Sequence, residues 1–279
     1  MDITPAPLAA RTEATPNATS IAGEGPLRAK NLQEELVGKV ALVTGADGGV
    51  GRALVDLLLA RGALVVAQDL RPGVEELARA SGGRVTAVVG DVADVDTADR
   101  SVHAALEHFG RLDILVNNAG RTLNKPVTET SDEDWDAVIR TNARGAFVQS
   151  RAAFAHMADH GGGAIVFVTS YAATVALPLG SAYSASKGAV SQLMKVLALE
   201  GGPVAIRSNA VAAGVIDTGF LNNIRPDGQD YLRSFGSAMP LGRIADPSEI
   251  AEVVLYLASD RASYVTGAVL AADGGFTAQ

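Results

Sequence analysis

Short apolar runs alternate along the chain with longer segments whose apolar residues recur at helical spacing. The run Val40–Thr44 ends at a glycine-rich turn, and residues 50–60 then show the helical pattern. Runs that are rich in β-branched residues and too short for a helix predict strands. We expect such strands at 40–44, 63–67, 85–89, 112–116, 164–169, 204–211 and 268–271.

Helical stretches separate most of these strands, and the two longest are expected at about 131–159 and 181–201. Strands that alternate with helices imply parallel pairing and right-handed crossovers. Because the strands are almost wholly apolar, both faces of the sheet should be covered. The pattern predicts an α/β fold, a doubly wound parallel sheet with helices on both faces. It forms one domain over 36–279, with the ligand beyond the carboxyl ends of the strands.

Two segments fall outside this alternation. Residues 1–35 are rich in Ala, Thr and Pro and have no periodic apolar face, which predicts a mobile N-terminal tail. Residues 217–242 contain several Gly and Pro residues and little strand character. A segment this long in a compact domain is often functional, so we interpret 217–242 as a substrate loop or lid; a variable surface excursion is the alternative.

Composition excludes several classes of protein. The 279 residues carry a formal net charge of -8, which does not favour a nucleic-acid partner or an acidic membrane. There is no cysteine, so disulfides, thiolate nucleophiles and cysteine-ligated metals are excluded. No apolar run is long enough to span a bilayer, and the N-terminus lacks the features of a secretory signal. We therefore expect a cytoplasmic enzyme with no membrane partner.

The glycine-rich turn follows the first predicted strand and opens the first predicted helix. Glycines there let backbone amides approach a diphosphate, and the helix N-terminus adds partial positive charge. No Walker lysine follows, so an ATP loop is not indicated. An ordinary tight turn is the alternative, but the position after strand one favours a dinucleotide site. The residues expected to form it are Gly45, Asp47, Gly48, Gly49, Val50 and Gly51.

Asp69 ends the second predicted strand, at the distance expected for an acid that binds the adenosine ribose. A carboxylate there accepts hydrogen bonds from the ribose hydroxyls and repels a 2′-phosphate. Leu70, the next residue, supplies no cation for such a phosphate. Arg71 could do so, but we expect it to be solvated. Taken alone, Asp69 would be better interpreted as a solvated strand-end residue, but the glycine turn upstream reverses that preference. These residues predict NAD as the cofactor, with NADP less favoured.

Tyr183 and Lys187 stand four apart at the start of the second long helix and so share one face. A lysine near a tyrosine hydroxyl stabilises the phenolate and lowers its pKa, which makes tyrosine a usable general acid/base. Ser170 closes the strand at 164–169, where a hydroxyl could hold a carbonyl oxygen. His156 and His160 are spaced as a possible metal pair, but without a third ligand we expect no metal.

Several separated motifs, taken together, resemble the single-domain branch of the short-chain dehydrogenase/reductase family, of the Tyr-x-x-x-Lys type. The resemblance covers about residue 36 to the end and implies a Rossmann-type fold. The motifs occur in family order, and Ser170 precedes Tyr183 by the family's usual interval. They are Thr44-Gly-x-x-x-Gly-x-Gly51, Asp91-Val92, Asn117-Asn118-Ala119-Gly120, Asn142, Ser170, Tyr183-x-x-x-Lys187 and Asp273-Gly274-Gly275.

The resemblance implies roles for individual residues. Tyr183 would exchange a proton with the substrate oxygen, which Ser170 would orient. Lys187 would lower the pKa of Tyr183 and hold the nicotinamide ribose, and Asn142 would keep a water in place. Further cofactor contacts would come from Asp91, Val92, Asn118, Ala119, Gly120, Gly214, Ile216 and Thr218. Ala213 replaces the family's usual proline, so the segment after it is expected to be less rigid.

The expected reaction is hydride transfer between a nicotinamide and a secondary alcohol or ketone. Apolar residues at 172–179 and at 220–221, together with 121–126, would line the substrate pocket. An NADPH-dependent 3-oxoacyl-carrier-protein reductase is the alternative enzyme; Asp69 opposes it, whereas Arg121, Lys125 and Arg144 would allow it. A non-catalytic dinucleotide sensor is more remote, because all four catalytic residues are present. The resemblance also implies a homotetramer or homodimer.

Overall fold

A parallel sheet of seven strands runs through the centre of the protein, in the order β3-β2-β1-β4-β5-β6-β7. The structure is a computed structural model that describes residues 34–218 and 228–279. Every pairing in the sheet is parallel, so the predicted doubly wound α/β fold is confirmed. The strands are β1 (Val40–Thr44), β2 (Leu64–Asp69), β3 (Val85–Val89), β4 (Ile114–Asn117), β5 (Gly163–Ser170), β6 (Ile206–Ala213) and β7 (Val269–Ala272).

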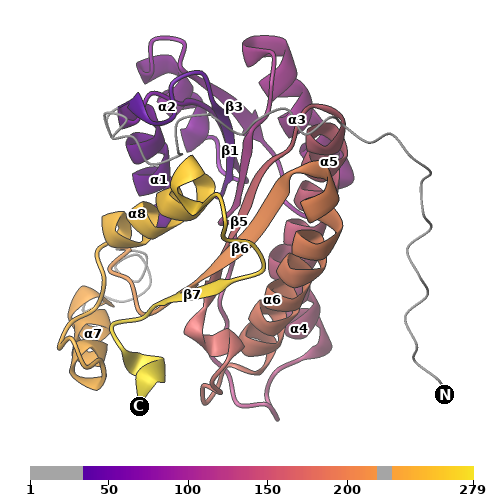
Figure 1. Ribbon diagram of the computed structural model, residues 1–279. Coiled ribbons are helices and arrows are strands. Elements are labelled where there is room, and N and C mark those ends of the chain that lie inside the picture. The colour runs from indigo at the N-terminus through magenta and orange to yellow at the C-terminus, as the bar shows by residue number, and fades with distance from the viewer. Residues whose placement is uncertain (1–33, 219–227) are drawn as a thin grey trace.

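Helices cover both faces of the sheet (Figure 1). One layer contains α1 (Gly49–Ala60), α2 (Gly73–Ala80) and α8 (Pro247–Ala258). The opposite layer contains α3 (Val95–Phe109), α5 (Gly145–Asp159) and α6 (Ser181–Gly201), with α4 (Asp132–Ile139) packed on α6. The remaining helix, α7 (Gly228–Ser234), precedes α8.

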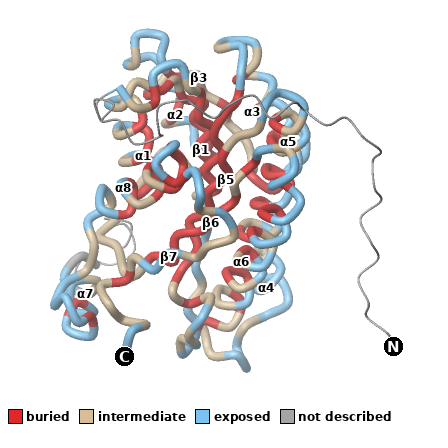
Figure 2. The backbone as a smooth tube through the Cα atoms, viewed as in Figure 1, coloured by how far each residue is buried: buried red, intermediate tan, exposed pale blue. Residues whose placement is uncertain are grey.

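Alternate residues of each central strand supply the two cores. In β1, Ala41 and Val43 face the α1 and α8 layer, whereas Val40 and Leu42 face α5 and α6. Successive side chains of a strand point to opposite faces, so a strand covered on both sides has to be apolar throughout. The buried backbone runs through the middle of the molecule in Figure 2.

The strand order reverses between β1 and β4, because β1 leads outward to β2 and β3 while β4 leads to β5, β6 and β7. Such a reversal leaves a crevice at the carboxyl ends of the two strands, where ligands bind in this class of sheet. The glycine-rich turn follows β1, and residues 118–120 follow β4. The topology therefore brings these two motifs together.

The long helix expected at 131–159 is interrupted. The structure has α4, then a π-helical turn at Arg140–Arg144, and then α5. A π turn places an extra residue in the helix and is common at functional sites. Its central residue is Asn142, which is buried. Apolar spacing does not reveal such an interruption, because the helical pattern continues on both sides.

The two segments outside the alternation are described only in part. Within 217–242, residues 219–227 lie outside the described residues; beyond them the chain forms α7 and a 3-10 turn at Phe235–Ala238 rather than an irregular loop. Residues 1–33 of the expected tail also lie outside the described residues. Glu35, which was assigned to the tail, forms ion pairs of 3.2 Å with Arg61 and 3.3 Å with Arg261. Among the described helices, none is long and apolar enough to cross a membrane.

Candidate active site

Hydrogen bonds join the glycine-rich turn to the segment that follows β4. The Thr44 hydroxyl accepts hydrogen bonds from the amides of Asn118 and Ala119, both at 3.0 Å. In return, the Asn118 side-chain amide donates to the carbonyls of Thr44 and Gly45, at 2.9 and 3.0 Å. Asn118 and Thr44 therefore fix the shape of the turn. Thr44 belongs to the glycine-rich motif but is not among the predicted site residues.

The glycines of the turn leave a cradle formed by main chain. Gly45 has φ +65°, and a Cβ on Gly51 would lie 1.9 Å from the Gly45 carbonyl oxygen. Gly49 has φ +51°, and a Cβ there would lie 3.0 Å from the Thr218 methyl group. Helix α1 begins here with no side-chain cap. Val50 points into the core, so only its main chain can serve a ligand.

The Asp69 carboxylate lies beside this cradle and is 7% exposed. It accepts hydrogen bonds from the Asp47 amide at 3.0 Å and the Arg71 amide at 2.9 Å. The Leu70 side chain is 70% exposed, so it points into solvent. The Arg71 side chain is 60% exposed, as expected, but it also pairs with two acids: its Nε lies 3.3 Å from Asp47 Oδ2 and 3.5 Å from Asp69 Oδ1.

Asp91 and Val92, expected at the adenine, follow β3. The Asp91 carboxylate accepts a hydrogen bond from the Ala93 amide at 2.8 Å and pairs with Arg140 at 3.0 Å. Val92 is buried, and a Cβ on Gly145 would come within 2.7 Å of its side chain. Both residues thus have structural partners, and their contact with adenine stays a prediction.

The catalytic candidates meet where β5 ends against α6. Ser170 is the last residue of β5, and its hydroxyl accepts a hydrogen bond from the Ala172 amide at 3.1 Å. Tyr183 and Lys187 lie one helical turn apart on α6, and the Ser170 side chain lies near enough to Tyr183 to lower its pKa. The Lys187 ammonium lies 5.7 Å from the centre of the Tyr183 ring and donates to the Val168 carbonyl at 3.0 Å.

The acid–base balance of this group differs from the sequence expectation. Burial raises the pKa of Tyr183, and the Ser170 side chain lowers it only in part. Burial also lowers the pKa of Lys187 to about 8. The lysine was expected to lower the tyrosine pKa, but desolvation penalises the charged forms of both side chains. In this structure burial is the largest cause of both pKa shifts.

Asn142 connects the π turn to the catalytic helix. Its side-chain oxygen accepts the Arg121 amide at 2.8 Å, and its amide nitrogen donates to the Arg121 carbonyl at 3.0 Å and the Ser186 hydroxyl at 2.9 Å. Both amide protons are therefore used. A water held by Asn142 would have to use a carbonyl oxygen of the residue. Ser186 was missed at the sequence level, since a lone serine on a helix carries no signal.

Gly120 lies next to the catalytic group. A Cβ on it would lie 3.5 Å from the Lys187 ammonium and 3.4 Å from Asn142 Oδ1. The predicted pocket walls also meet here, because the Lys125 amide donates to the Leu179 carbonyl at 2.9 Å. Segments 121–126 and 172–179 are thus side by side, whereas residues 220–221 lie outside the described residues.

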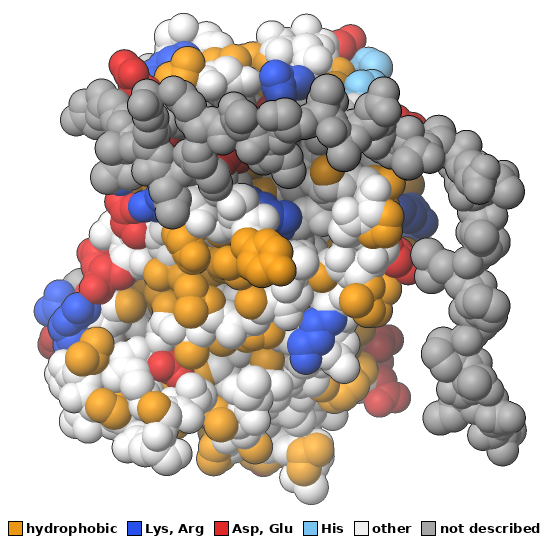
Figure 3. Space-filling view, viewed as in Figure 1, with side chains coloured by type: hydrophobic (Ala, Val, Ile, Leu, Met, Phe, Trp, Pro, Cys, Tyr) orange, Lys and Arg blue, Asp and Glu red, His pale blue; other side chains and the backbone are white. Residues whose placement is uncertain are grey.

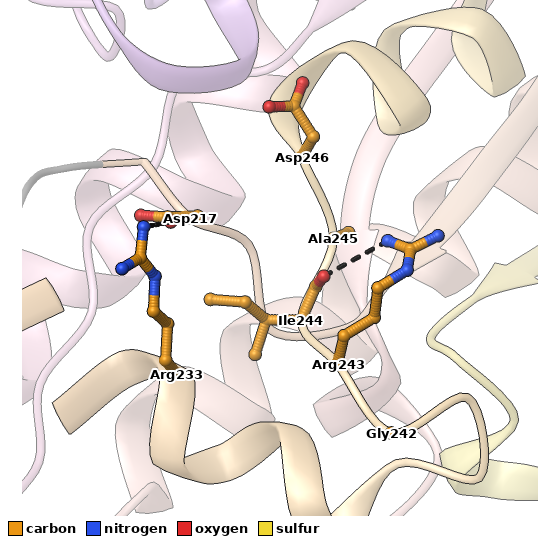
Figure 4. Close-up of a pocket in the computed structure, with 7 residues that line it drawn as sticks. All are labelled: Asp217, Arg233, Gly242, Arg243, Ile244, Ala245 and Asp246. Carbon is orange, nitrogen blue, oxygen red and sulfur yellow. Dashed lines mark hydrogen bonds and ion pairs between the residues drawn. The ribbon is translucent and has the colours of Figure 1, made fainter. Parts of the chain in front are cut away.

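The segment after β6 brings the last predicted cofactor residues to the cradle. Gly214 lies against Asp273, and its amide donates to the Ala272 carbonyl at 3.0 Å. Ile216 pairs with Ala245 in a short parallel bridge, and Thr218 lies against Gly49 as described above. Behind this segment is a cavity of about 370 Å³, in which Arg233 reaches toward Asp217 at 3.5 Å (Figure 4). Its other lining residues are Gly242, Arg243, Ile244, Ala245 and Asp246.

These features fit a dinucleotide cofactor. The cradle has main-chain amides at a helix N-terminus for a diphosphate. A fixed carboxylate, Asp69, stands at the end of β2 for ribose hydroxyls. An ammonium group has three donors, and Lys187 has one acceptor, the Val168 carbonyl, among the described residues. Lys187 is therefore able to hold a further hydroxyl pair.

Comparisons with known proteins agree with this arrangement. A family model described as enoyl-(acyl carrier protein) reductase matches residues 45–277. The chain is 43% identical over 248 residues to D-threitol dehydrogenase of Mycolicibacterium smegmatis, covering 87% of this chain and 94% of that protein. It is 40% identical over 251 residues to cis-4-hydroxycyclohexanecarboxylate dehydrogenase of Sinomonas cyclohexanicum, covering 88% and 100%.

Among solved structures, the crystal structure of gox2181 superimposes with a TM-score of 0.81 and 34% sequence identity, covering 88% of this chain and 98% of that one. The chain belongs to the short-chain dehydrogenase/reductase family and is an oxidoreductase that acts on CH–OH groups with a nicotinamide cofactor.

Proposed function

We propose that the enzyme is an NAD-dependent dehydrogenase of a secondary alcohol, with Tyr183 as its general acid/base. The observation that carries the proposal is the packing of the carboxyl end of β5, where Ser170 lies, against α6, which holds Tyr183 and Lys187. The Lys187 ammonium lies 5.7 Å from the centre of the Tyr183 ring. When bound, the nicotinamide supplies the hydride acceptor. The relatives are named dehydrogenases, so the alternative of a non-catalytic sensor is set aside.

In this proposal the Tyr183 oxygen removes the proton of the substrate hydroxyl while a hydride leaves the carbon that bears this hydroxyl. The Ser170 hydroxyl donates a hydrogen bond to the substrate oxygen and so positions it. Lys187 holds positive charge near the Tyr183 oxygen, which favours the phenolate. Asn142 keeps Arg121 and Ser186 in place around the site.

The substrate proposal rests on the segments that meet at the site. Residues 172–179 include Val175, Leu177, Pro178 and Leu179, which offer an apolar wall. Such a wall suits a compact or cyclic carbon skeleton of modest polarity. The relatives named above act on a hydroxycyclohexane carboxylate and on a small polyol, which is consistent with a secondary alcohol.

A 3-oxoacyl-carrier-protein reductase is the second candidate, and a relative of that name in Thermotoga maritima, 38% identical over 244 residues, favours it. Such an enzyme needs free cations at the pocket mouth for its acidic carrier. Lys125 is paired with Asp134 at 2.5 Å, and Arg144 donates to the Ala93 carbonyl at 3.1 Å. Two of the three candidate cations, Lys125 and Arg144, therefore have partners. In addition, the Asp69 carboxylate would repel the 2′-phosphate of NADPH.

We also propose that the enzyme is cytoplasmic and forms a homotetramer or homodimer. Light scattering would measure the molar mass of the assembly. Exposed apolar side chains support the assembly: Phe147 on α5, Leu199 on α6, Leu270 on β7 and the nearby Tyr264. Hydrophobic side chains gather on the face where β7 and α8 lie (Figure 3). Exposed apolar patches are typical of protein interfaces.

The direct test of the mechanism is Tyr183→Phe, which keeps the ring and removes the hydroxyl. The kcat for alcohol oxidation should fall by about 10²–10⁴-fold, the usual contribution of a general acid/base. The dissociation constant of NAD should change little. Tyr256→Phe, on α8, is the matched control and should keep full activity. Near-normal turnover of Tyr183→Phe would contradict the mechanism.

A further inference from the structure

The carboxylate of Asp47 occupies a specific place in the glycine-rich turn. It lies against the main chain of Gly73, the first residue of α2, where a Cβ would come within 2.1 Å of its Oδ1. On its other side it pairs with the Arg71 guanidinium at 3.3 Å. Only 18% of the Asp47 side chain is exposed, so the carboxylate is held rather than free in solvent.

Arg71 is held between two acids. Its Nε lies 3.3 Å from Asp47 and 3.5 Å from Asp69. Its Nη2 lies 2.9 Å from the position that a Cβ on Gly48 would occupy, so the guanidinium covers that glycine. Arg71 is therefore the cation beside the carboxylate that would bind the adenosine ribose.

This cation is what a 2′-phosphate would need. A phosphate that enters beside Asp69 meets like charge, and Arg71 could offset that charge by a bidentate contact. Two carboxylates and one guanidinium give the cluster a net charge of about −1 at neutral pH. As long as Asp47 pairs with Arg71, the guanidinium is neutralised and turned toward the glycine turn.

We propose that Asp47 is a specificity-determining residue, which disfavours NADP by pairing with Arg71. The inference rests on the proposed NAD site and assigns its selectivity to two carboxylates rather than to Asp69 alone. Asp47 acts through Arg71 and has no part in the chemistry. Because Arg71 is 60% exposed, solvent weakens the pair, and the effect of Asp47 should be moderate.

The test is equilibrium binding of NAD and NADP to the purified full chain, without turnover. Asp47→Asn keeps the size of the side chain and removes its charge. It should strengthen NADP binding about tenfold, or about 1.4 kcal/mol, and change NAD binding by less than about threefold. The fragments 5′-AMP and 2′,5′-ADP should show the same split, because they differ at the 2′ position.

Two further variants isolate the cause. Asp56→Asn, on α1, removes the same charge from an exposed acid that pairs with Arg52, and should leave the NADP to NAD ratio unchanged. Asp47→Asn combined with Arg71→Ala should lose the gain in NADP binding. Melting temperatures of all variants check that each is folded.

The outcomes separate this inference from the proposed function. If neither dinucleotide binds the unmodified chain, the proposed function fails. If the unmodified chain binds NAD more tightly but Asp47→Asn strengthens NADP no more than Asp56→Asn does, the inference alone is overturned. It is also overturned if the gain persists without Arg71, or if Asp47→Asn weakens NADP binding.

Discussion

At the scale of single residues, burial controls the chemistry of the site. The motif Tyr183-x-x-x-Lys187 is readable in the sequence, but the direction of the tyrosine pKa is not. Spacing shows that the two residues share a helix face, whereas desolvation depends on the packing of β5 and α6 around them. The pairing of Arg71 with Asp47 was missed for the same kind of reason, since it depends on how α2 follows β2.

The pKa of Tyr183 predicts how alcohol oxidation depends on pH. Oxidation needs the phenolate, and burial holds the pKa of Tyr183 above its ordinary value of 10. The phenolate fraction therefore rises with pH across the range from about 7 to 10. We expect kcat/KM for oxidation to rise over this range, by at most about tenfold per pH unit.

Ketone reduction is the internal control, because it needs the protonated tyrosine, which is the dominant form over the same range. Its kcat/KM should stay nearly constant up to about pH 8, above which Lys187 loses its charge. The measurement is a pair of pH profiles with saturating cofactor. A plateau of the oxidation profile near pH 7 would show that the bound cofactor and Lys187 overcome the effect of burial.

At the scale of elements, strands were easier to predict than interruptions. Apolar runs located all seven strands to within a few residues. The strand expected from 204 begins at Ile206, because Gly202–Val204 forms a 3-10 turn and Ala205 has φ +58°. The π turn around Asn142 had no sequence signal, since it is set by bonds to Arg121 and Ser186 from other parts of the chain.

The turn between β1 and α1 gives the prediction at this scale. Gly51→Ala would place a Cβ 1.9 Å from the Gly45 carbonyl, so the main chain of the cradle has to move. NAD binding should weaken at least tenfold, or about 1.4 kcal/mol, because the diphosphate depends on the position of main-chain amides. The measurement is the dissociation constant of NAD by calorimetry.

Gly188→Ala is the matched control, because a Cβ there meets no atom within 4 Å. It lies on α6, where alanine is a better helix former than glycine, so it should fold at least as well as the unmodified chain. NAD binding by Gly51→Ala at full strength, in a protein of normal melting temperature, would show that the cradle is not the diphosphate site.

At the scale of the whole molecule, the sequence predicts the architecture because its separate patterns all indicate the same fold. Apolar runs, crossover helices and the glycine turn all require a parallel sheet with a crevice where its order reverses. The fold was accordingly predictable, whereas the roles of the four catalytic candidates stay predictions. The beginning of the folded domain was less so, because the Glu35 ion pairs involve Arg61 and Arg261, which are far away in the sequence.

The central claim is that the folded chain oxidises a secondary alcohol with NAD. The most direct measurement is kcat/KM of the full chain for a panel of small cyclic and linear secondary alcohols, with NAD and with NADP. We expect NAD reduction with at least one alcohol and a preference for NAD on the order of a hundredfold, since Asp69 opposes the 2′-phosphate. Comparable kcat/KM values for the two cofactors, or no NAD reduction with any alcohol, would contradict the account.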